Sequence, residues 1–525
     1  GMSSPTVCAE PVMGVEKPSR LSLAKMVKLS MLGVVSLALL YVVWSLYLAG
    51  EPLFAVLVMA VLVGFALIYG NRRFYTARFV FPAVVTVGLF IAFPVIYTSY
   101  VGFTNYSASN LLSFHRVNDI HLSQVTVDKS SERPFFLLPV EGGYRLVLRG
   151  ADGDLISDPF VADGQPQRLP MQASGELAAP AEAFLPARDM VRLRGELGAI
   201  TALLPDGQSL TTSGIRTMAH VQPVFEELED GRLRNRLDGG ILVADHSVGF
   251  YRDEAGNQVA PGWRVNVGLD NFKRILFSEG IRGPMLEIFV WTVAFALLSV
   301  LFTFGVGVLL AVILQWEHLR YRGLYRILLI LPYAVPGFIS ILVFRGLFNQ
   351  NFGEINMILE AVFGIRPEWF SNPTLARAMT IIVNTWLGYP YMMLLAMGYL
   401  QSVPGDHAKA AALEGASPVR TFFSITLPQI LPPFAPMLIS AFAFNFNNLV
   451  LILLLTRGLP DIPGTLIPAG STDLLASFTY RISFMDSGQN FGLAGAIATL
   501  IFVIVGAMAY ANFVALRRAV AAKGK

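Results

Sequence analysis

The stretch Lys409–Pro428, KAAALEGASPVRTFFSITLP, is the polar interruption from which the order of the rest of the chain can be worked out. It lies between two long apolar runs. The run up to Glu414 favours a helix, and Gly415 is suited to end it. Ser417-Pro418 then suits the start of a second helix. The stretch therefore predicts a helix-turn-helix at a membrane surface, where another protein could dock.

The composition is that of a membrane protein. Of 525 residues, 54% are hydrophobic and 14% are charged, whereas soluble domains have about 25% charged residues. The net charge of +3 is too small to indicate a nucleic-acid partner. Lysine and arginine cluster beside apolar runs, where they orient the chain in the bilayer. The single cysteine, Cys8, excludes an intramolecular disulfide or a cysteine zinc site, and we expect no metal.

Working outward from Lys409–Pro428, apolar runs close to the ~20 residues that cross a bilayer predict eight spans. The runs cover residues 29–49, 53–70, 79–103, 285–314, 327–347, 375–400, 430–455 and 491–515. With both chain ends inside, every short loop obeys the positive-inside rule. The predicted fold is an all-α polytopic membrane protein with cytoplasmic termini.

Residues 105–267 have the character of a water-soluble domain placed outside. Tyr144–Arg149 alternates strongly, and turn signals occur at Asp152-Gly153, at 205–207 and at 254–257, so the domain is predicted to be mainly β. Residues 173–188 predict loop or short helix, and 268–276 an amphipathic helix at the outer interface.

These boundaries divide the chain into four predicted parts. They are a cytoplasmic tail (1–28), three transmembrane helices (29–104), the outer β-rich domain (105–267), and a core of five helices (268–525) that carries the cytoplasmic loop 404–428.

The sequence does not predict that this chain itself hydrolyses ATP or couples transport to an ion gradient. No Gly-x-x-x-x-Gly-Lys-Ser/Thr phosphate loop occurs, so the chain is not expected to be an enzyme or to hold a nucleotide cofactor. No histidine is placed for a proton path, and the charges of Glu287 and Arg345 lie near the outer ends of spans, where they can reach water. No coupling carboxylate near mid-bilayer is evident.

Uncharged polar residues recur on one face of each of two spans. The spacing i, i+3, i+4, i+7 is met by Asn384, Leu387, Gly388 and Tyr391, and again by Ala441, Phe444, Asn445 and Asn448. Amides exchange hydrogen bonds with sugar hydroxyls, and aromatic rings cover the C–H faces of a pyranose. Intramembrane asparagines also hydrogen-bond neighbouring helices, at about 0.6–2 kcal/mol each, and glycine permits close packing. The spacing alone leaves a sugar site and simple packing equally open.

At the opening stretch the residues resemble a known signature. Glu414-Gly415, followed after nine residues by Ile425-x-Leu427-Pro428, resembles the cytoplasmic EAA loop of ABC-importer permeases. The segments LPYAVPGFISIL (331–342), VNTWLGYPYMM (383–393), FAFNFNNLVLI (442–452) and PAGSTDLL (468–475) resemble the maltose/maltodextrin permeases of that family. The layout of spans around a large insert is also similar.

The resemblance implies a permease of the bacterial inner membrane that carries maltose or maltodextrin through the lipid bilayer. It implies a second homologous permease, two copies of an ABC ATPase that uses the ATP, a periplasmic maltose-binding protein, and an immunoglobulin-like fold for the insert. The implied sugar site is Asn384, Leu387, Gly388, Tyr391, Phe444, Asn445 and Asn448. The implied ATPase-docking loop (409–428) contains Lys409, Ala410, Ala411, Glu414, Gly415, Ile425, Leu427 and Pro428.

Two residues depart from the family pattern, and other functions stay open. Lys409 stands where the signature has an acid, and Ala441 where a serine can line the site. The alternatives are an importer of the same class for another neutral sugar, a sensory membrane protein, and an ion-coupled carrier. A phosphorylated sugar is disfavoured because neither polar face carries a basic residue.

Overall fold

The computed structural model describes residues 22–174 and 180–524. Cys8, most of the predicted tail 1–28 and part of the segment 173–188 lie outside the described residues. By its internal contacts the chain divides into two units, Gly1–Thr98 and Ser99–Lys525, each of which is considered by itself.

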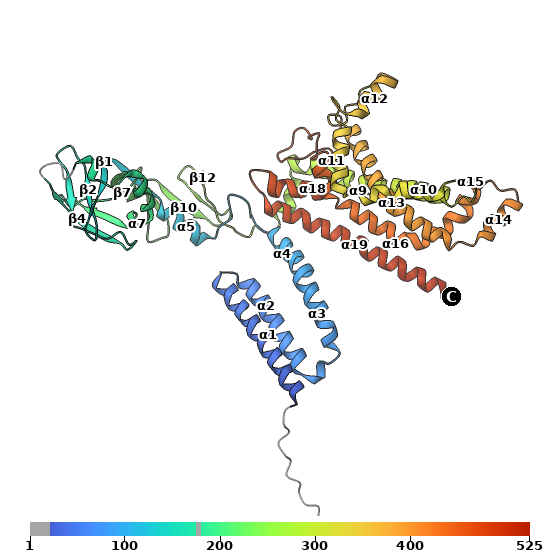
Figure 1. The fold of residues 1–525 in the computed structure, drawn as a ribbon, viewed down its shortest axis with the longest axis horizontal. Coiled ribbons are helices and arrows are strands. Elements are labelled where there is room, and N and C mark those ends of the chain that lie inside the picture. The colour runs from blue at the N-terminus through green and yellow to red at the C-terminus, as the bar shows by residue number, and fades with distance from the viewer. Residues whose placement is uncertain (1–21, 175–179, 525) are drawn as a thin grey trace, which may run out of the picture. The chain divides into compact units, whose positions relative to one another are not determined.

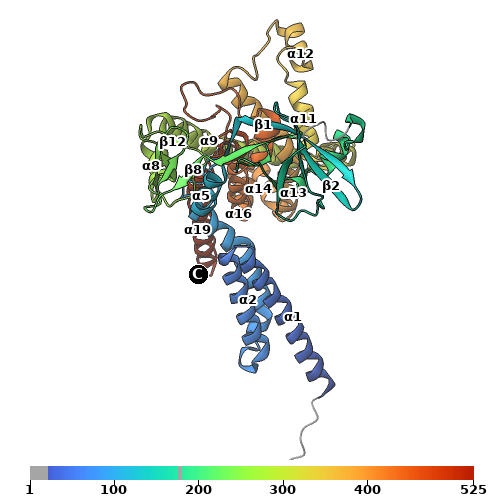
Figure 2. The same cartoon turned by 90° about the vertical axis from the view of Figure 1, so that its left-hand side faces the viewer.

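The first unit is a helical hairpin followed by the start of a third apolar helix. α1 (Leu23–Leu48) and α2 (Pro52–Gly70) run side by side, joined by a tight turn (Figures 1 and 2). The turn uses the left-handed backbone of Gly50 (φ +79°). After the short turn η1 (Arg72–Phe74), Arg78 donates to the carbonyls of Ile68 and Tyr69 at 3.1 and 3.3 Å, which caps the end of α2.

The third apolar helix is continuous over 25 residues, Ala77–Val101, and leads into the second unit. It consists of α3 (Ala77–Val87), the π-helical turn η2 (Gly88–Ala92) and α4 (Phe93–Val101). Most apolar side chains of these three helices are exposed, as suits segments that lie in lipid.

The insert begins with α5 (Phe114–Ser123) and a closed β-barrel in the strand order β1 to β7 (Figure 1). The strands are β1 (Val125–Val140), β2 (Gly143–Leu148), β3 (Leu155–Ser157), β4 (Gln167–Ala173), β5 (Ile200–Leu203), β6 (Ser209–Thr212) and β7 (Thr217–Pro223). Between β4 and β5 lie η3 (Ala181–Ala183), α6 (Ala187–Arg192) and α7 (Arg194–Leu197). Phe135, Leu137, Leu146 and Leu148 fill the barrel.

A second, five-stranded sheet follows the barrel in the order β12-β11-β10-β9-β8. Its strands are β8 (Phe225–Glu227), β9 (Leu233–Asn235), β10 (Ile241–Asp245), β11 (Phe250–Arg252) and β12 (Gln258–Val259). Val117 and His121 of α5 are buried, and Tyr251 and Trp263 are the largest buried side chains of this subdomain.

The β-rich character of the insert is confirmed, but the immunoglobulin-like expectation is wrong. An immunoglobulin fold packs two antiparallel sheets face to face. Here β1 pairs with both β2 and β7 and closes a barrel, and β4 pairs with β5 in parallel. The predicted strand at Tyr144 and the turns at Gly153 and Gly207 (φ +115° and +89°) are confirmed.

The two connections of the insert run together. Thr104 bridges to Asn266. Asn271 Nδ2 donates to the carbonyls of Gly102 and Thr104 at 2.9 and 2.7 Å. The predicted short helix is confirmed as α8 (Asp270–Phe277), with Asn271 and Ile275 buried and Leu276 and Phe277 exposed.

The core of the second unit is helical. Its first half contains α9 (Glu279–Leu314), α10 (Arg322–Ala334), α11 (Gly337–Leu347), α12 (Glu354–Phe363) and α13 (Pro373–Gln401). Its second half contains α14 (Gly405–Leu413), α15 (Pro418–Thr421), the π-helical turn η4 (Phe422–Thr426), α16 (Leu427–Phe446), α17 (Leu449–Leu455), α18 (Leu475–Tyr480), the π-helical turn η5 (Arg481–Met485) and α19 (Phe491–Lys523). α9 and α13 pack against each other along their lengths (Figure 1).

Two predicted spans are not continuous helices. Over the described ranges, seven helices are long and apolar enough to cross a membrane, or up to eight if α10 and α11, bent by 94°, form one broken span. The bend falls at Val335-Pro336, because a proline disfavours helical backbone in the residue before it. The predicted run 430–455 breaks at Asn447-Asn448, and its helix begins earlier, at Pro418.

Candidate functional site

Two helices far apart in sequence meet along a seam in which a glycine of each helix faces a larger side chain of the other. The seam is formed by residues spaced four apart, which are Ser299, Thr303 and Gly307 on α9 and Asn384, Gly388 and Met392 on α13. A Cβ added at Gly307 would lie 2.7 Å from Met392 Cβ, and one added at Gly388 would lie 2.8 Å from Thr303 Cγ2. Glycine therefore allows the two backbones to approach, and the packing interpretation of Gly388 is confirmed.

An amide network, formed by Ser299, Asn384, Asn445 and Asn448, joins α9, α13 and the end of α16. Asn384 Nδ2 donates to Ser299 Oγ and to Asn445 Oδ1, both at 2.8 Å. Asn448 Nδ2 donates to Asn384 Oδ1 at 3.3 Å, and Asn445 Nδ2 donates to the Ala441 carbonyl at 2.9 Å. Asn384 and Asn445 are only 6% and 7% exposed. The predicted hydrogen bonds between helices are therefore present.

The same residues line a cavity of about 640 Å³. Every residue of the predicted sugar site borders it, namely Asn384, Leu387, Gly388, Tyr391, Phe444, Asn445 and Asn448. The rings of Tyr391 and Phe444 are 39% and 72% exposed, so they are available to a ligand. The described lining carries no charged side chain. The two predicted faces thus meet on one neutral cavity, and their binding of a sugar stays a prediction.

Both helix breaks border this cavity. Pro332 and Val335 line it at the bend between α10 and α11, and Asn448 lines it between α16 and α17. Asn448 also caps α17, since its Oδ1 accepts from the Leu451 N–H at 3.4 Å. Irregular backbone at membrane depth is tolerated where it faces a cavity, so the position of both breaks beside this cavity lowers their cost.

Several lining residues were not predicted. They include Thr303 of α9, Tyr333 and Phe338 beside the α10–α11 bend, and Met437 and Ser440 of α16. The two prolines of LPYAVPGF were a usable signal for a bend, but nothing local indicated which helix face the bend would expose. Ser440 and Ala441 both line the cavity, so a hydroxyl is present next to the position where the serine was expected.

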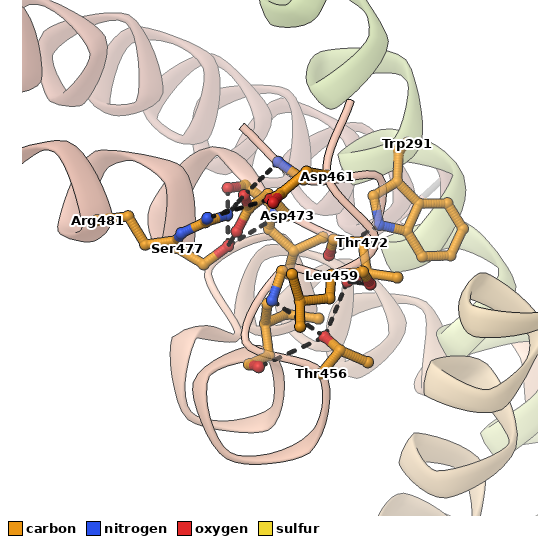
Figure 3. Close-up of polar contacts among 12 residues, drawn as sticks. Trp291, Thr456, Leu459, Asp461, Thr472, Asp473, Ser477 and Arg481 are labelled. Atoms are coloured by element: carbon orange, nitrogen blue, oxygen red, sulfur yellow. Dashed lines mark hydrogen bonds and ion pairs between the residues drawn. The ribbon is translucent and has the colours of Figure 1, made fainter. Parts of the chain in front are cut away.

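A second polar cluster, here called the ion-pair network, is formed by Asp461, Asp473, Ser477 and Arg481 (Figure 3). Arg481 pairs with Asp473, which is fully buried, and with Asp461 at 3.6 Å. Ser477 Oγ and the Gly470 N–H donate to Asp473 at 2.9 and 2.7 Å. Burial raises the pKa of the Asp473 carboxyl, and these donors and Arg481 act against that shift.

Further hydrogen bonds beside the ion-pair network hold the segment that follows α17. Thr472 Oγ1 donates to Thr456 Oγ1 at 2.8 Å, beside the end of α17, and Trp291 Nε1 of α9 donates to the Thr472 carbonyl at 3.2 Å (Figure 3). Nearby, Arg377 of α13 pairs with Glu287 at 3.0 Å. The sequence interpretation of Glu287 as reaching for water missed this partner, which lies on another helix.

The opening stretch forms the predicted helix-turn-helix. α14 ends before Gly415, whose φ is +83°, and Pro418 begins α15 with Ser417 Oγ accepting from the Arg420 N–H at 3.2 Å. A cavity of about 580 Å³ is bordered by Ala410, Ala411, Glu414, Gly415 and Ile425 among others. Lys409 is exposed on α14, and Leu427 and Pro428 open α16. The helix-turn-helix is confirmed, and its docking role stays a prediction.

Within residues 22–174 and 180–524, no group of three or more His, Cys, Asp or Glu side chains is arranged to hold a metal ion. The arrangement that remains is a neutral cavity inside the helical core and a surface helix-turn-helix on the loop before α16.

Family models match two parts of the chain. Residues 112–268 match the model described as the maltose transport system permease protein MalF P2 domain. Residues 286–519 match the model described as the binding-protein-dependent transport system inner membrane component.

Whole-chain relatives are also known. A maltose/maltodextrin transport system permease protein MalF from Vibrio cholerae serotype O1 is 45% identical, covering 92% of this chain and 94% of the relative. The MalF protein of Escherichia coli strain K12 is 46% identical, covering 93% and 96%. A chain of a bacterial alginate ABC transporter crystal structure is similar over 47% of this chain and 81% of that chain, at 21% identity and a TM-score of 0.40. On the whole-chain identity, this chain belongs to the MalF family of transport system permeases, multi-pass proteins of the inner membrane with a periplasmic P2 domain.

Proposed function

We propose that this chain is the permease subunit of an ATP-driven maltose/maltodextrin importer and that the cavity between α13 and α16 is its sugar site. The observation that carries the proposal is the meeting of the predicted site residues on one neutral cavity of about 640 Å³. The names of the relatives, maltose/maltodextrin permeases at 45–46% identity, give the substrate class.

The chemistry of the cavity suits a neutral sugar. The side-chain amides of Asn384, Asn445 and Asn448 can bond to hydroxyl groups, which both donate and accept. Tyr391 and Phe444 offer exposed rings to the apolar faces of a pyranose. A phosphorylated or carboxylated sugar would need a basic partner in the cavity, and the described lining provides none.

Transport then needs other chains. The proposed partners are a second homologous permease, two copies of an ABC ATPase and a periplasmic maltose-binding protein. The helix-turn-helix α14–α15 docks on one ATPase, and its movement on ATP binding is passed along α16 to the cavity wall. The ATP is bound and hydrolysed by the ATPase, so this chain is neither an enzyme nor the holder of a cofactor.

The proposed topology counts the broken pair α10–α11 as one span. Eight spans then place residues 1–28, 404–428 and the C-terminus in the cytoplasm and residues 105–267 in the periplasm. The departure at Lys409 lies on the exposed surface of α14, where either Glu414 takes the place of the missing acid or the ATPase carries an altered charge.

Uptake of labelled maltose into vesicles that contain the complete importer, with ATP inside, tests the proposal. We expect ATP-dependent uptake that survives an uncoupler, and a loss of at least about tenfold on Tyr391→Ala, which removes an exposed ring from the cavity. Uptake abolished by the uncoupler at constant ATP would instead indicate an ion-coupled carrier, and no uptake at all a sensory protein.

The docking role has its own test. Deletion of residues 406–418 removes most of α14 and the turn after it, while the cavity residues are retained. We expect loss of sugar-stimulated ATP hydrolysis. Unchanged transport and stimulation in this deletion would show that the ATPase docks elsewhere.

A further inference from the structure

The hydrogen bonds of the amide network fix which way each asparagine points. The Ala441 carbonyl can only accept a hydrogen bond, so Asn445 must direct its Nδ2 towards it, at 2.9 Å. The Oδ1 of Asn445 then points towards Asn384, and Asn384 Nδ2 donates to it at 2.8 Å. A backbone group therefore sets the orientation of two side-chain amides.

Asn384 has a second N–H, and Ser299 accepts it. Ser299 Oγ lies 2.8 Å from Asn384 Nδ2. Ser299 is fully buried on α9, and it does not belong to the described cavity lining. With two acceptors in place, the amide plane of Asn384 is held against rotation. Without Ser299, one N–H of a nearly buried amide would lose its partner.

This arrangement leaves different hydrogen-bonding groups unused on the two sides of the cavity. Asn384 uses both N–H groups and accepts once, from Asn448, so an Oδ1 lone pair is what it can offer a ligand. Asn445 and Asn448 each use one N–H within the described network, which leaves one N–H on each to donate. α13 therefore offers an acceptor, and the end of α16 and the break after it offer donors.

We propose that Ser299 is a positioning residue of the sugar site: it holds the Asn384 amide so that Asn384 Oδ1 accepts a hydrogen bond from one particular hydroxyl of the sugar. The proposal rests on the proposed function and deepens it, since it gives the site a fixed direction of hydrogen bonding. Ser299 acts only through Asn384 and touches no ligand.

The test compares Ser299→Ala with the unaltered chain in proteoliposomes that contain the complete importer and ATP. The probes are maltose and a panel of its monodeoxy analogues, each lacking one hydroxyl. We expect the KM for maltose to rise about threefold to tenfold, the effect of one lost hydrogen bond. In the unaltered chain, the analogue that lacks the hydroxyl bound by Asn384 should have a higher KM than maltose. In the variant this difference between the analogue and maltose should disappear.

The pattern over the analogues distinguishes positioning from a general structural role. Looser packing of α9 against α13 would weaken every analogue by a similar factor. Loss of one oriented acceptor would change the ratio for one hydroxyl only. Because the same binding protein serves both forms, its own preferences cancel in the ratio of variant to unaltered chain.

Thr499→Val is the matched control. It removes a hydroxyl from a spanning helix, where Thr499 Oγ1 donates to the Gly495 carbonyl of α19 at 2.7 Å, away from the cavity lining. We expect its KM and analogue pattern to be unchanged. If Ser299→Ala does not assemble, Ser299→Cys keeps a weak acceptor of similar size and should show the same change at smaller amplitude.

The outcomes separate the two proposals. ATP-dependent uptake by the unaltered chain, with identical KM and analogue pattern in Ser299→Ala, overturns the role of Ser299 alone. No maltose uptake by the unaltered chain overturns the proposed function, and with it the assignment of Ser299 to a sugar site. A uniform loss over all analogues also overturns the positioning role, because it indicates packing.

Discussion

Two of the regions in which the protein buries polar groups are built in opposite ways. The amide network is neutral, its bonds are spread over α9, α13 and α16, and it opens on a cavity. The ion-pair network is charged, and its central carboxylate, Asp473, is fully buried and surrounded by partners from residues 470–481 (Figure 3). One network is exposed to a ligand and the other is closed.

The difference shows which polar groups are free to take part in binding. Hydrogen bonds between membrane helices average about 0.6 kcal/mol, so a sugar hydroxyl can replace one at little cost. Removal of one partner from a buried ion pair costs about 3–5 kcal/mol, because a charge is left without compensation. The amide network can therefore bind a sugar hydroxyl through its remaining donors and acceptor at little cost, whereas the ion-pair network holds its segment in one arrangement.

The largest expected effect comes from Arg481→Ala. It leaves the buried carboxylate of Asp473 unpaired and should destabilise the segment 456–480 by about 3–5 kcal/mol. Hydrogen exchange of peptides from this segment, measured on the purified chain in lipid nanodiscs, reports the loss as faster local opening.

Asp461→Asn is its control. Asp461 is 67% exposed at its side chain and lies 3.6 Å from Arg481, so its loss should cost less than about 1 kcal/mol. Equal exchange in the two variants would mean that Asp473 is not the partner that matters, and the contrast with the amide network would fail.

Asn384→Leu is expected to affect stability less than Arg481→Ala does, but to affect maltose uptake more. The change removes three hydrogen bonds, which should lower stability by about 1–2 kcal/mol. Maltose uptake should fall by more than about tenfold, because the acceptor on the α13 side of the cavity is lost. Thermal unfolding and uptake are measured on the same preparation. Uptake that falls only in proportion to the folded protein would remove Asn384 from the site.

The smallest expected effect concerns a buried group that is titratable. His121 of α5 is 1% exposed and packs edge-on against Phe225 and Tyr251. Burial lowers its pKa below the ordinary 6.5, and the Pro261 backbone nearby opposes the shift more weakly. The neutral ring is therefore favoured in the folded state. Its contribution to stability is complete above pH 6.5 and is lost as the pH falls through the lowered pKa.

Hydrogen exchange of α5 at pH 7.5 and pH 5, corrected for the intrinsic rate, checks this expectation. Exchange should be faster at pH 5 in the unaltered chain, and His121→Leu should abolish the difference. A difference that persists in the variant would show that His121 is not the group responsible for it.

Local patterns predicted the parts of the site that lie within one helix. The face of Asn384, Leu387, Gly388 and Tyr391 follows from a period of 3.6 residues, because an unbroken helix turns residues of that spacing to one side. The turn at Gly415 and the start at Pro418 follow from backbone preferences of single residues. The strand β2 follows from alternation.

Patterns of this kind failed where a partner is distant or a helix is interrupted. The sequence predicted the run 430–455 as continuous because Asn445 and Asn448 fit one face of a single helix, whereas the structure breaks the helix at Asn447-Asn448. The barrel was missed because closure depends on β1 pairing with both β2 and β7. Glu287 was interpreted without Arg377, which lies 90 residues away on another helix.

The sequence by itself determined the apolar spans, the helix-turn-helix at residues 405–421, the β character of the insert and the two polar faces that carry the predicted site. Each of these depends on neighbours within a turn or two of backbone. Only the tertiary structure decided that the faces share a cavity, that both helix breaks border it, and that Ser299 supports Asn384 from 85 residues away. Those facts depend on which helices pack together, and packing is chosen by the shape and polarity of whole helix faces rather than by any local pattern.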